Sequence, residues 1–138
     1  MGEVPTEQLA RDLLDASTRA LTAALADGTY VGWFAVSPDD KVISGVGAHI
    51  KPALPRMTHS RTRVAATPVP LVVNVYTELE WRGRGIARAL MRVLMDWAVG
   101  IGAERVVLHA SDAGRPLYVS LGFAPTNEMR WFTPEDPM

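Results

Sequence analysis

Residues 72–88, VVNVYTELEWRGRGIAR, constrain the fold of this 138-residue chain more than any other segment. An apolar, β-branched run leads through a short turn into a helix predicted over 83–100, whose apolar side chains recur at helical spacing. A helix N-terminus offers free backbone N–H groups and the positive end of the helix dipole, so it can hold an anion. Small and basic residues gather at this point: Arg82, Gly83, Arg84, Gly85 and Arg88. The glycines allow close approach to the backbone, so the segment predicts a phosphate site, and most simply one for a pyrophosphate.

The remainder of the chain alternates helix and strand signals. Further helices are predicted over 5–27 and 115–121, and strands over 29–37, 41–51, 70–77, 105–110 and 128–133. Gly45 and Gly47 indicate a bulge or close packing within the second strand. Residues 52–69 contain three prolines and little periodicity, and we expect a long loop there. A hairpin followed by crossover units predicts an α/β (α+β) fold with a mixed sheet, in one domain over residues 1–138.

Composition excludes several classes of function. The chain has no cysteine, which rules out disulfide scaffolds, cysteine nucleophiles and thiolate metal sites. Its three histidines lack metal-ligand spacing, so no metal is expected. A net charge of −1 argues against nucleic-acid binding. No apolar run approaches the roughly 20 residues of a membrane span, and residues 1–27 carry acids unlike a signal peptide. We therefore expect a cytoplasmic protein without a membrane partner.

Positive charge is unevenly distributed. Residues 41–77 contain no acid and carry these five bases: Lys41, Lys51, Arg56, Arg61 and Arg63. Such a segment either attracts an anionic group or forms a solvated basic loop. The sequence leaves both interpretations open.

Two motifs point to one family. The dinucleotide fingerprint G-x-G-x-x-G fails, because Arg88 occupies its third glycine position, and no G-K-[ST] of a Walker A loop is present. The pattern R-x-x-G-x-A does fit, at Arg82, Gly85 and Ala87, and Y-x-x-L-G-F follows one strand later, from Tyr118 to Phe123. This order resembles the Gcn5-related N-acetyltransferase (GNAT) superfamily over about residues 29–133.

The resemblance implies a mostly antiparallel sheet with a splayed central strand pair, flanked by helices. It also implies acetyl-CoA as the acetyl donor. Its pyrophosphate would lie on the loop Arg82, Gly83, Arg84, Gly85, Ile86, Ala87 and Arg88, and its pantetheine arm along Val75, Tyr76 and Thr77. Ser111 or Asp112 would replace an asparagine that contacts this arm in many members. Tyr118 matches the tyrosine that serves as general acid.

The implied chemistry is attack of a neutral amine on the thioester. An edge of free N–H groups at Val75–Thr77 could stabilise the oxyanion, and Tyr118 could protonate the departing thiolate. Glu78 and His109 are candidate general bases, His109 because it titrates near neutral pH. Each also has a plain structural interpretation, as a solvated turn residue and a hydrogen-bonded histidine, and water could relay the proton instead.

The start of the chain departs from the family. Only one helix precedes Thr29, so the usual opening strand and first helix are expected to be missing. The sequence fits a true start upstream of residue 1, a truncated chain, or a protein that works with a shorter sheet. An exposed edge would remain at 29–37, and exposed edges tend to pair, so we expect a homodimer. The predicted function is acetyl transfer to a primary amine of a small molecule or protein. The alternatives are a non-catalytic module that binds coenzyme A and a phosphate-binding domain outside the family.

Overall fold

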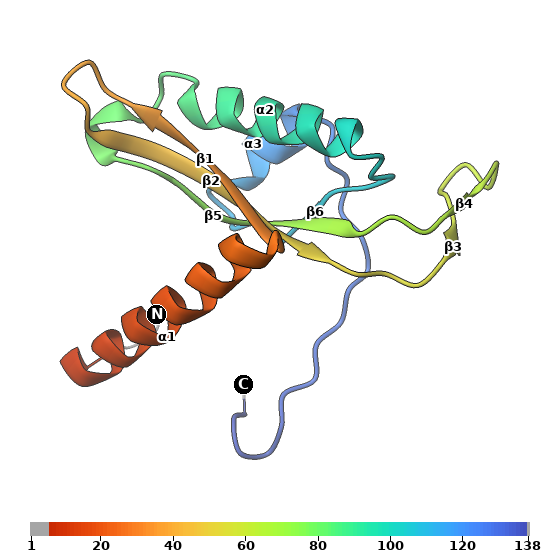
Figure 1. Ribbon diagram of the computed structural model, residues 1–138, viewed down its shortest axis with the longest axis horizontal. Helices are drawn as coiled ribbons and strands as arrows, with labels where there is room; N and C mark the ends of the chain where they lie inside the picture. Colours follow the sequence, from red (N-terminus) through yellow and green to blue (C-terminus); the bar gives the residue numbers. More distant parts are fainter. Residues whose placement is uncertain (1–5, 138) are drawn as a thin grey trace.

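The computed structural model describes residues 6–137, which form one four-stranded sheet with helices around it (Figure 1). The strands lie in the order β1-β2-β5-β6, and β3 and β4 form a separate small hairpin. The helices are α1 (Glu7–Asp27), α2 (Ile86–Gly100) and α3 (Arg115–Ser120), with a short 3₁₀ turn, η1 (Leu79–Trp81), before α2. The strands are β1 (Tyr30–Val36), β2 (Val42–Lys51), β3 (Arg56–Met57), β4 (Val64–Ala65), β5 (Val69–Thr77) and β6 (Val107–Leu108). β1, β2 and β5 pair antiparallel and β6 joins β5 in parallel, which confirms the mixed, mostly antiparallel sheet.

Helix α2 covers one face of the sheet and makes the core with it (Figure 1). Met91 and Leu94 are fully buried on the helix, against Val46 and Ala48 of β2. Burial of an aliphatic side chain of this size contributes roughly 1.5–3 kcal/mol, so this layer accounts for much of the stability. The helical stripe predicted over 83–100 is therefore the stripe that packs on the sheet, although the helix itself begins at Ile86.

The opposite face of the sheet carries aromatic side chains that lie over two glycines. The hydroxyl of Tyr30 occupies the space of a side chain at Gly47, since a Cβ built there would lie 1.9 Å from it. A Cβ on Gly45 would meet Tyr76 at 2.8 Å and Phe34 at 3.2 Å. Close packing is thus the reason for both glycines, as the sequence indicates.

A capping side chain and a glycine determine where helix α1 begins and ends. Thr6 caps its start by accepting a hydrogen bond from the Leu9 N–H at 3.1 Å, and Gly28 ends it in the left-handed conformation with φ 80°. The predicted first residue of this helix, Pro5, lies outside the described residues. None of the described helices combines the length and the apolar character needed to cross a bilayer.

Two sequence predictions are wrong. The segment 52–69 is not a continuous loop, because it contains the β3–β4 hairpin. Residues 128–133 form no strand in the part of the chain that the structure describes. β6 is only two residues long, so it offers too short an edge for that segment to pair with. The side chains of Glu128 and Arg130 contact His109 instead, while Trp131 remains 81% exposed.

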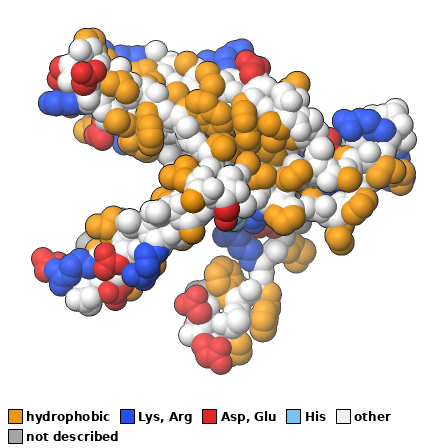
Figure 2. All heavy atoms as spheres, in the orientation of Figure 1, with side chains coloured by type: hydrophobic (Ala, Val, Ile, Leu, Met, Phe, Trp, Pro, Cys, Tyr) orange, Lys and Arg blue, Asp and Glu red, His pale blue; other side chains and the backbone are white. Residues whose placement is uncertain are grey.

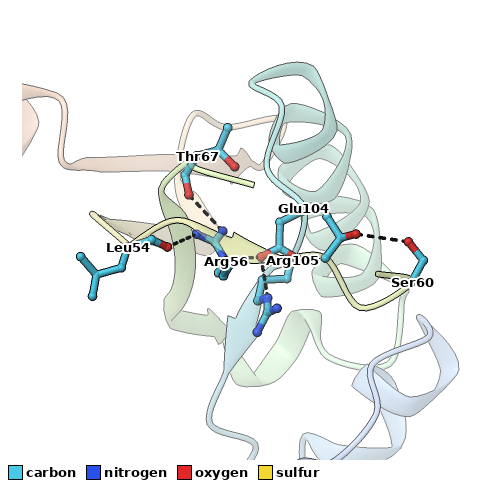
Figure 3. Close-up of polar contacts among 7 residues, drawn as sticks. Leu54, Arg56, Ser60, Thr67, Glu104 and Arg105 are labelled. Atoms are coloured by element: carbon cyan, nitrogen blue, oxygen red, sulfur yellow. Dashed lines mark hydrogen bonds and ion pairs between the residues drawn. The ribbon is translucent and has the colours of Figure 1, made fainter. Parts of the chain in front are cut away.

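The base of the hairpin is tied to the body by an ion cluster (Figure 3). The Glu104 side chain is only 3% exposed and accepts hydrogen bonds from Arg56 Nε at 2.6 Å and Arg105 Nε at 2.7 Å. Arg56 also donates to the Leu54 and Thr67 carbonyls. Burial disfavours the charged carboxylate, but the two arginines outweigh it and lower the pKa of Glu104. Arg56 is therefore a structural residue and is not available to an anion.

Candidate active site

A groove of about 710 Å³ lies between the end of β5, the turn before α2 and the start of α3. It brings together residues that are far apart in the sequence. The predicted cofactor residues on its wall are Val75, Tyr76, Thr77, Arg82, Gly83, Gly85, Ile86, Ala87, Arg88 and Ser111, and Tyr118 is on the same wall.

The start of α2 presents bare backbone to this groove. Gly83 and Gly85 have φ angles of 76° and 77°, which side chains rarely adopt, and an added Cβ on either would meet no atom within 4 Å. The bond from the Ala89 N–H to the Gly85 carbonyl, at 3.0 Å, is the first of the helix. The N–H groups of residues 86–88 precede it and have no helical acceptor. An open backbone with free donors at the positive end of a helix fits a pyrophosphate group.

The three arginines of this turn have different positions. Arg82 Nε donates to the Thr77 carbonyl at 2.9 Å, and Arg88 Nη2 donates to Ser120 Oγ at 2.7 Å. Both line the groove. Arg84 does not line it; its guanidinium lies 4.6 Å from the ring of Trp81, which does line the groove, and donates to the Glu80 carbonyl at 3.3 Å. The structure therefore does not bring Arg84 into the groove with the other predicted residues.

Strands β5 and β6 separate beside the groove. They pair only at Leu71–Val107 and Val72–Leu108, and β5 then continues to Thr77 without β6. A bulge at Asn74, which has φ 58°, shifts the pairing of β5 with β2 at the same point. Asn74 Nδ2 donates to the Tyr30 hydroxyl at 3.2 Å. The splayed strand pair is thus present, and its free β5 edge faces the groove.

The free edge is held from behind by a residue that the sequence analysis missed. Ser44 on β2 is fully buried, and its hydroxyl donates to the Tyr76 carbonyl at 2.7 Å and lies 2.8 Å from Thr77 Oγ1. Together with Arg82, it fixes the backbone of the last two residues of β5. A lone serine in a strand carries no motif, and only its register opposite Thr77 gives it this role.

Tyr118 lines the same groove as this edge. Its ring packs edge-to-face on Phe123 with centroids 6.1 Å apart, and burial raises the pKa of its phenol. The hydroxyl consequently keeps its proton at neutral pH. Ser111 accepts a hydrogen bond from the Gly114 N–H at 3.1 Å and so shapes the turn before α3.

Comparison with known proteins decides the family. Residues 3–123 match the model of the acetyltransferase (GNAT) family. The chain belongs to the GNAT acetyltransferase family. The aminoglycoside N(6')-acetyltransferase type 1 of Stenotrophomonas maltophilia is 24% identical over 134 residues, which cover 93% of this chain and 74% of that protein.

Solved structures of GNAT proteins share the fold. A GCN5-related N-acetyltransferase from Ralstonia eutropha JMP134 is 29% identical with a TM-score of 0.80, over 94% of this chain and 81% of that one. A predicted acetyltransferase from Clostridium acetobutylicum, crystallised with acetyl-CoA, is 26% identical with a TM-score of 0.76. The match covers 96% of this chain and 79% of that one.

The two candidate bases of this GNAT domain lie off the groove wall. Glu78 is exposed at the end of β5, where its N–H donates to the Ile43 carbonyl at 2.8 Å. His109 lines a second hollow of about 410 Å³, which shares Tyr118 with the groove. There Arg130 Nη2 is 3.1 Å and Glu128 Oε1 is 3.8 Å from its Nδ1. Within residues 6–137, no group of three or more acidic and histidine side chains is placed to hold a metal ion.

Proposed function

We propose that this acetyltransferase is an N-acetyltransferase that moves the acetyl group of acetyl-CoA directly to a primary amine. One observation carries the proposal: a single groove contains the anion-binding start of α2, the free edge of β5 and the Tyr118 phenol. These are the three functions that acetyl transfer from a thioester requires, namely binding of the phosphates, stabilisation of the oxyanion and protonation of the leaving group.

Different groups of the groove bind the cofactor and stabilise the oxyanion. When bound, acetyl-CoA supplies an activated thioester with a thiol leaving group. The N–H groups of residues 86–88, with Arg82 and Arg88 beside them, would hold its pyrophosphate. Backbone N–H groups of the free β5 edge, between Val75 and Thr77, would donate to the carbonyl oxygen as negative charge develops there.

Proton transfer completes the reaction. The amine nitrogen forms the new C–N bond, the C–S bond breaks, and the Tyr118 hydroxyl donates its proton to the departing sulfur. The departing thiolate, whose conjugate thiol has an ordinary pKa of about 8.5, takes the proton as the C–S bond breaks, and the Tyr118 phenolate, the stronger base of the two, then regains a proton from water. The attacking amine loses its surplus proton to water, since neither Glu78 nor His109 lines the groove.

The relative from Stenotrophomonas supports a small-molecule acceptor, because its name specifies an amino group of an aminoglycoside. We therefore propose small polyamines and amino sugars as the first acceptors to examine, with peptide amines second.

The test is release of free thiol from acetyl-CoA in the presence of a panel of primary amines. We expect amine-dependent release that requires Tyr118, and an acetylated amine detected by mass spectrometry. Binding of acetyl-CoA without thiol release for any amine would contradict the proposal and favour a module that only binds coenzyme A.

A further inference from the structure

The two helices beside the groove are held to the body in different ways. Four residues of α2 are buried, and Figure 2 shows apolar side chains gathered in the middle of the molecule, where α2 meets the sheet. α3 is six residues long and has no buried residue. It rests on the core through half-buried side chains, among them Tyr118. Because elements with little buried surface open locally at low free energy, the position of α3 depends on its few individual contacts.

One hydrogen bond joins α3 to another element. Arg88 Nη2, in the first turn of α2, donates to Ser120 Oγ, at the end of α3, at 2.7 Å. Among residues 6–137, the other hydrogen bonds of α3 stay within the helix and its flanking turns. The Arg88 side chain also lines the groove, whereas Ser120 does not. The bond therefore links the wall of the proposed phosphate site to the helix that carries Tyr118.

The chemistry of Ser120 suits an acceptor for an arginine. Its hydroxyl gives its single hydrogen to the Leu117 carbonyl at 2.6 Å, so its lone pairs remain for Arg88. Alanine is the better helix former, and a serine that bonds back to the preceding turn weakens a helix slightly. Helix propensity therefore gives no reason for a serine at this position. Arg88 keeps further N–H donors for a phosphate, because a guanidinium has several.

We propose that Ser120 is a positioning residue that couples phosphate binding to the placement of Tyr118. Ser120 orients the Arg88 guanidinium on the groove wall. An anion bound there fixes the guanidinium and, through Ser120, the C-terminal end of α3. Binding energy from phosphates remote from the reacting atoms is thereby used to order the acid that the reaction needs. This inference rests on the proposed function, since it requires the phosphates of coenzyme A in the groove.

The experiment is amide hydrogen exchange of the 138-residue chain with and without coenzyme A, which requires no acceptor amine. The N–H groups of Leu121, Gly122 and Phe123 report on α3, because they donate to its carbonyls and these residues do not line the groove. Saturating coenzyme A should slow their exchange at least about tenfold in the native chain. In Ser120→Ala the slowing should be less than about threefold at equal occupancy, which calorimetric titration sets. Ser120→Thr keeps the hydroxyl and should restore the native response.

Two controls separate coupling from folding and from contact with the ligand. Val119→Ala changes the neighbouring residue of α3, which is 56% exposed, and should respond to coenzyme A as the native chain does. Pantetheine has the arm of coenzyme A without its phosphates, and should leave exchange of these amides unchanged in every variant.

The outcomes distinguish this coupling from the proposed function. Equal slowing in the native chain and in Ser120→Ala would overturn the coupling alone, and so would slowing by pantetheine. A folded chain that takes up no coenzyme A would overturn both. Slowing that requires the Ser120 hydroxyl, without thiol release for any amine, would support the coupling and contradict the proposed function.

Discussion

At the scale of single residues, substitution of Tyr118 has the most specific expected effect on catalysis. Tyr118→Phe removes the hydroxyl and keeps the ring that packs on Phe123. We expect kcat to fall about 100-fold or more, as for loss of a general acid, while the dissociation constant of acetyl-CoA changes little. Steady-state kinetics with calorimetric titration of the same sample would measure both. An unchanged kcat would assign the leaving-group proton to another donor.

The pH dependence of the rate follows from the same residue. Burial raises the pKa of the Tyr118 phenol above its ordinary value of 10.0. The acid form is the active one, so it persists through neutral pH and is lost only as the pH rises through the raised pKa. The native kcat profile should therefore decline only at pH values above about 10. A decline that begins near pH 8, and disappears in Tyr118→Phe, would contradict the assigned environment.

Ser44 should act on the reaction through the backbone of β5. Ser44→Ala removes the donor to the Tyr76 carbonyl, and a lost buried hydrogen bond costs about 1–3 kcal/mol. Because this bond fixes the β5 backbone that forms the free edge, we expect kcat to fall about tenfold with little change in KM for acetyl-CoA. The control is Ser37→Ala, another buried serine, which lies in the β1–β2 turn. It should lower only the melting temperature, and equal kinetic effects of both variants would exclude a positioning role.

At the scale of elements, the start of α2 separates two arginines that look alike in the sequence. Arg88→Glu places a negative charge on the groove wall at the helix N-terminus, and we expect acetyl-CoA to bind at least about tenfold more weakly. Arg84→Glu reverses a charge that lies over the Trp81 ring and does not itself line the groove, and should have a smaller effect. Titration calorimetry on both variants decides the order, and a larger loss for Arg84→Glu would place its side chain on the phosphates.

The sequence predicts those elements whose signals are local. The stripe of α2, the glycine turn before it and the Tyr118 motif could each be read along the chain, and they meet in one groove. Ser44 could not be found in this way, because its role depends on register between strands 33 residues apart. Residues 128–133 show the opposite error, since the sequence predicts a strand there but the short β6 offers no edge to pair with.

At the scale of the whole molecule, Glu104 joins the hairpin of β3 and β4 to the body (Figure 3). Glu104→Gln leaves two arginines without their carboxylate, and we expect a loss of about 1–3 kcal/mol of unfolding free energy. The lowered pKa of Glu104 makes its contribution fully present above the ordinary value of 4.5 and lost as the pH falls through the folded pKa. Thermal melts from pH 3 to 7 should show the native chain and the variant converging at low pH. Glu135→Gln, an exposed control, should follow the native curve, and parallel curves for Glu104→Gln would contradict the ion cluster.

Every catalytic role assigned above requires that the groove binds acetyl-CoA. Calorimetric titration of the 138-residue chain with acetyl-CoA tests it most directly. The account predicts one site per chain, weakened by Arg88→Glu and unaffected by Tyr118→Phe. A folded sample that takes up no acetyl-CoA at millimolar concentration would contradict it.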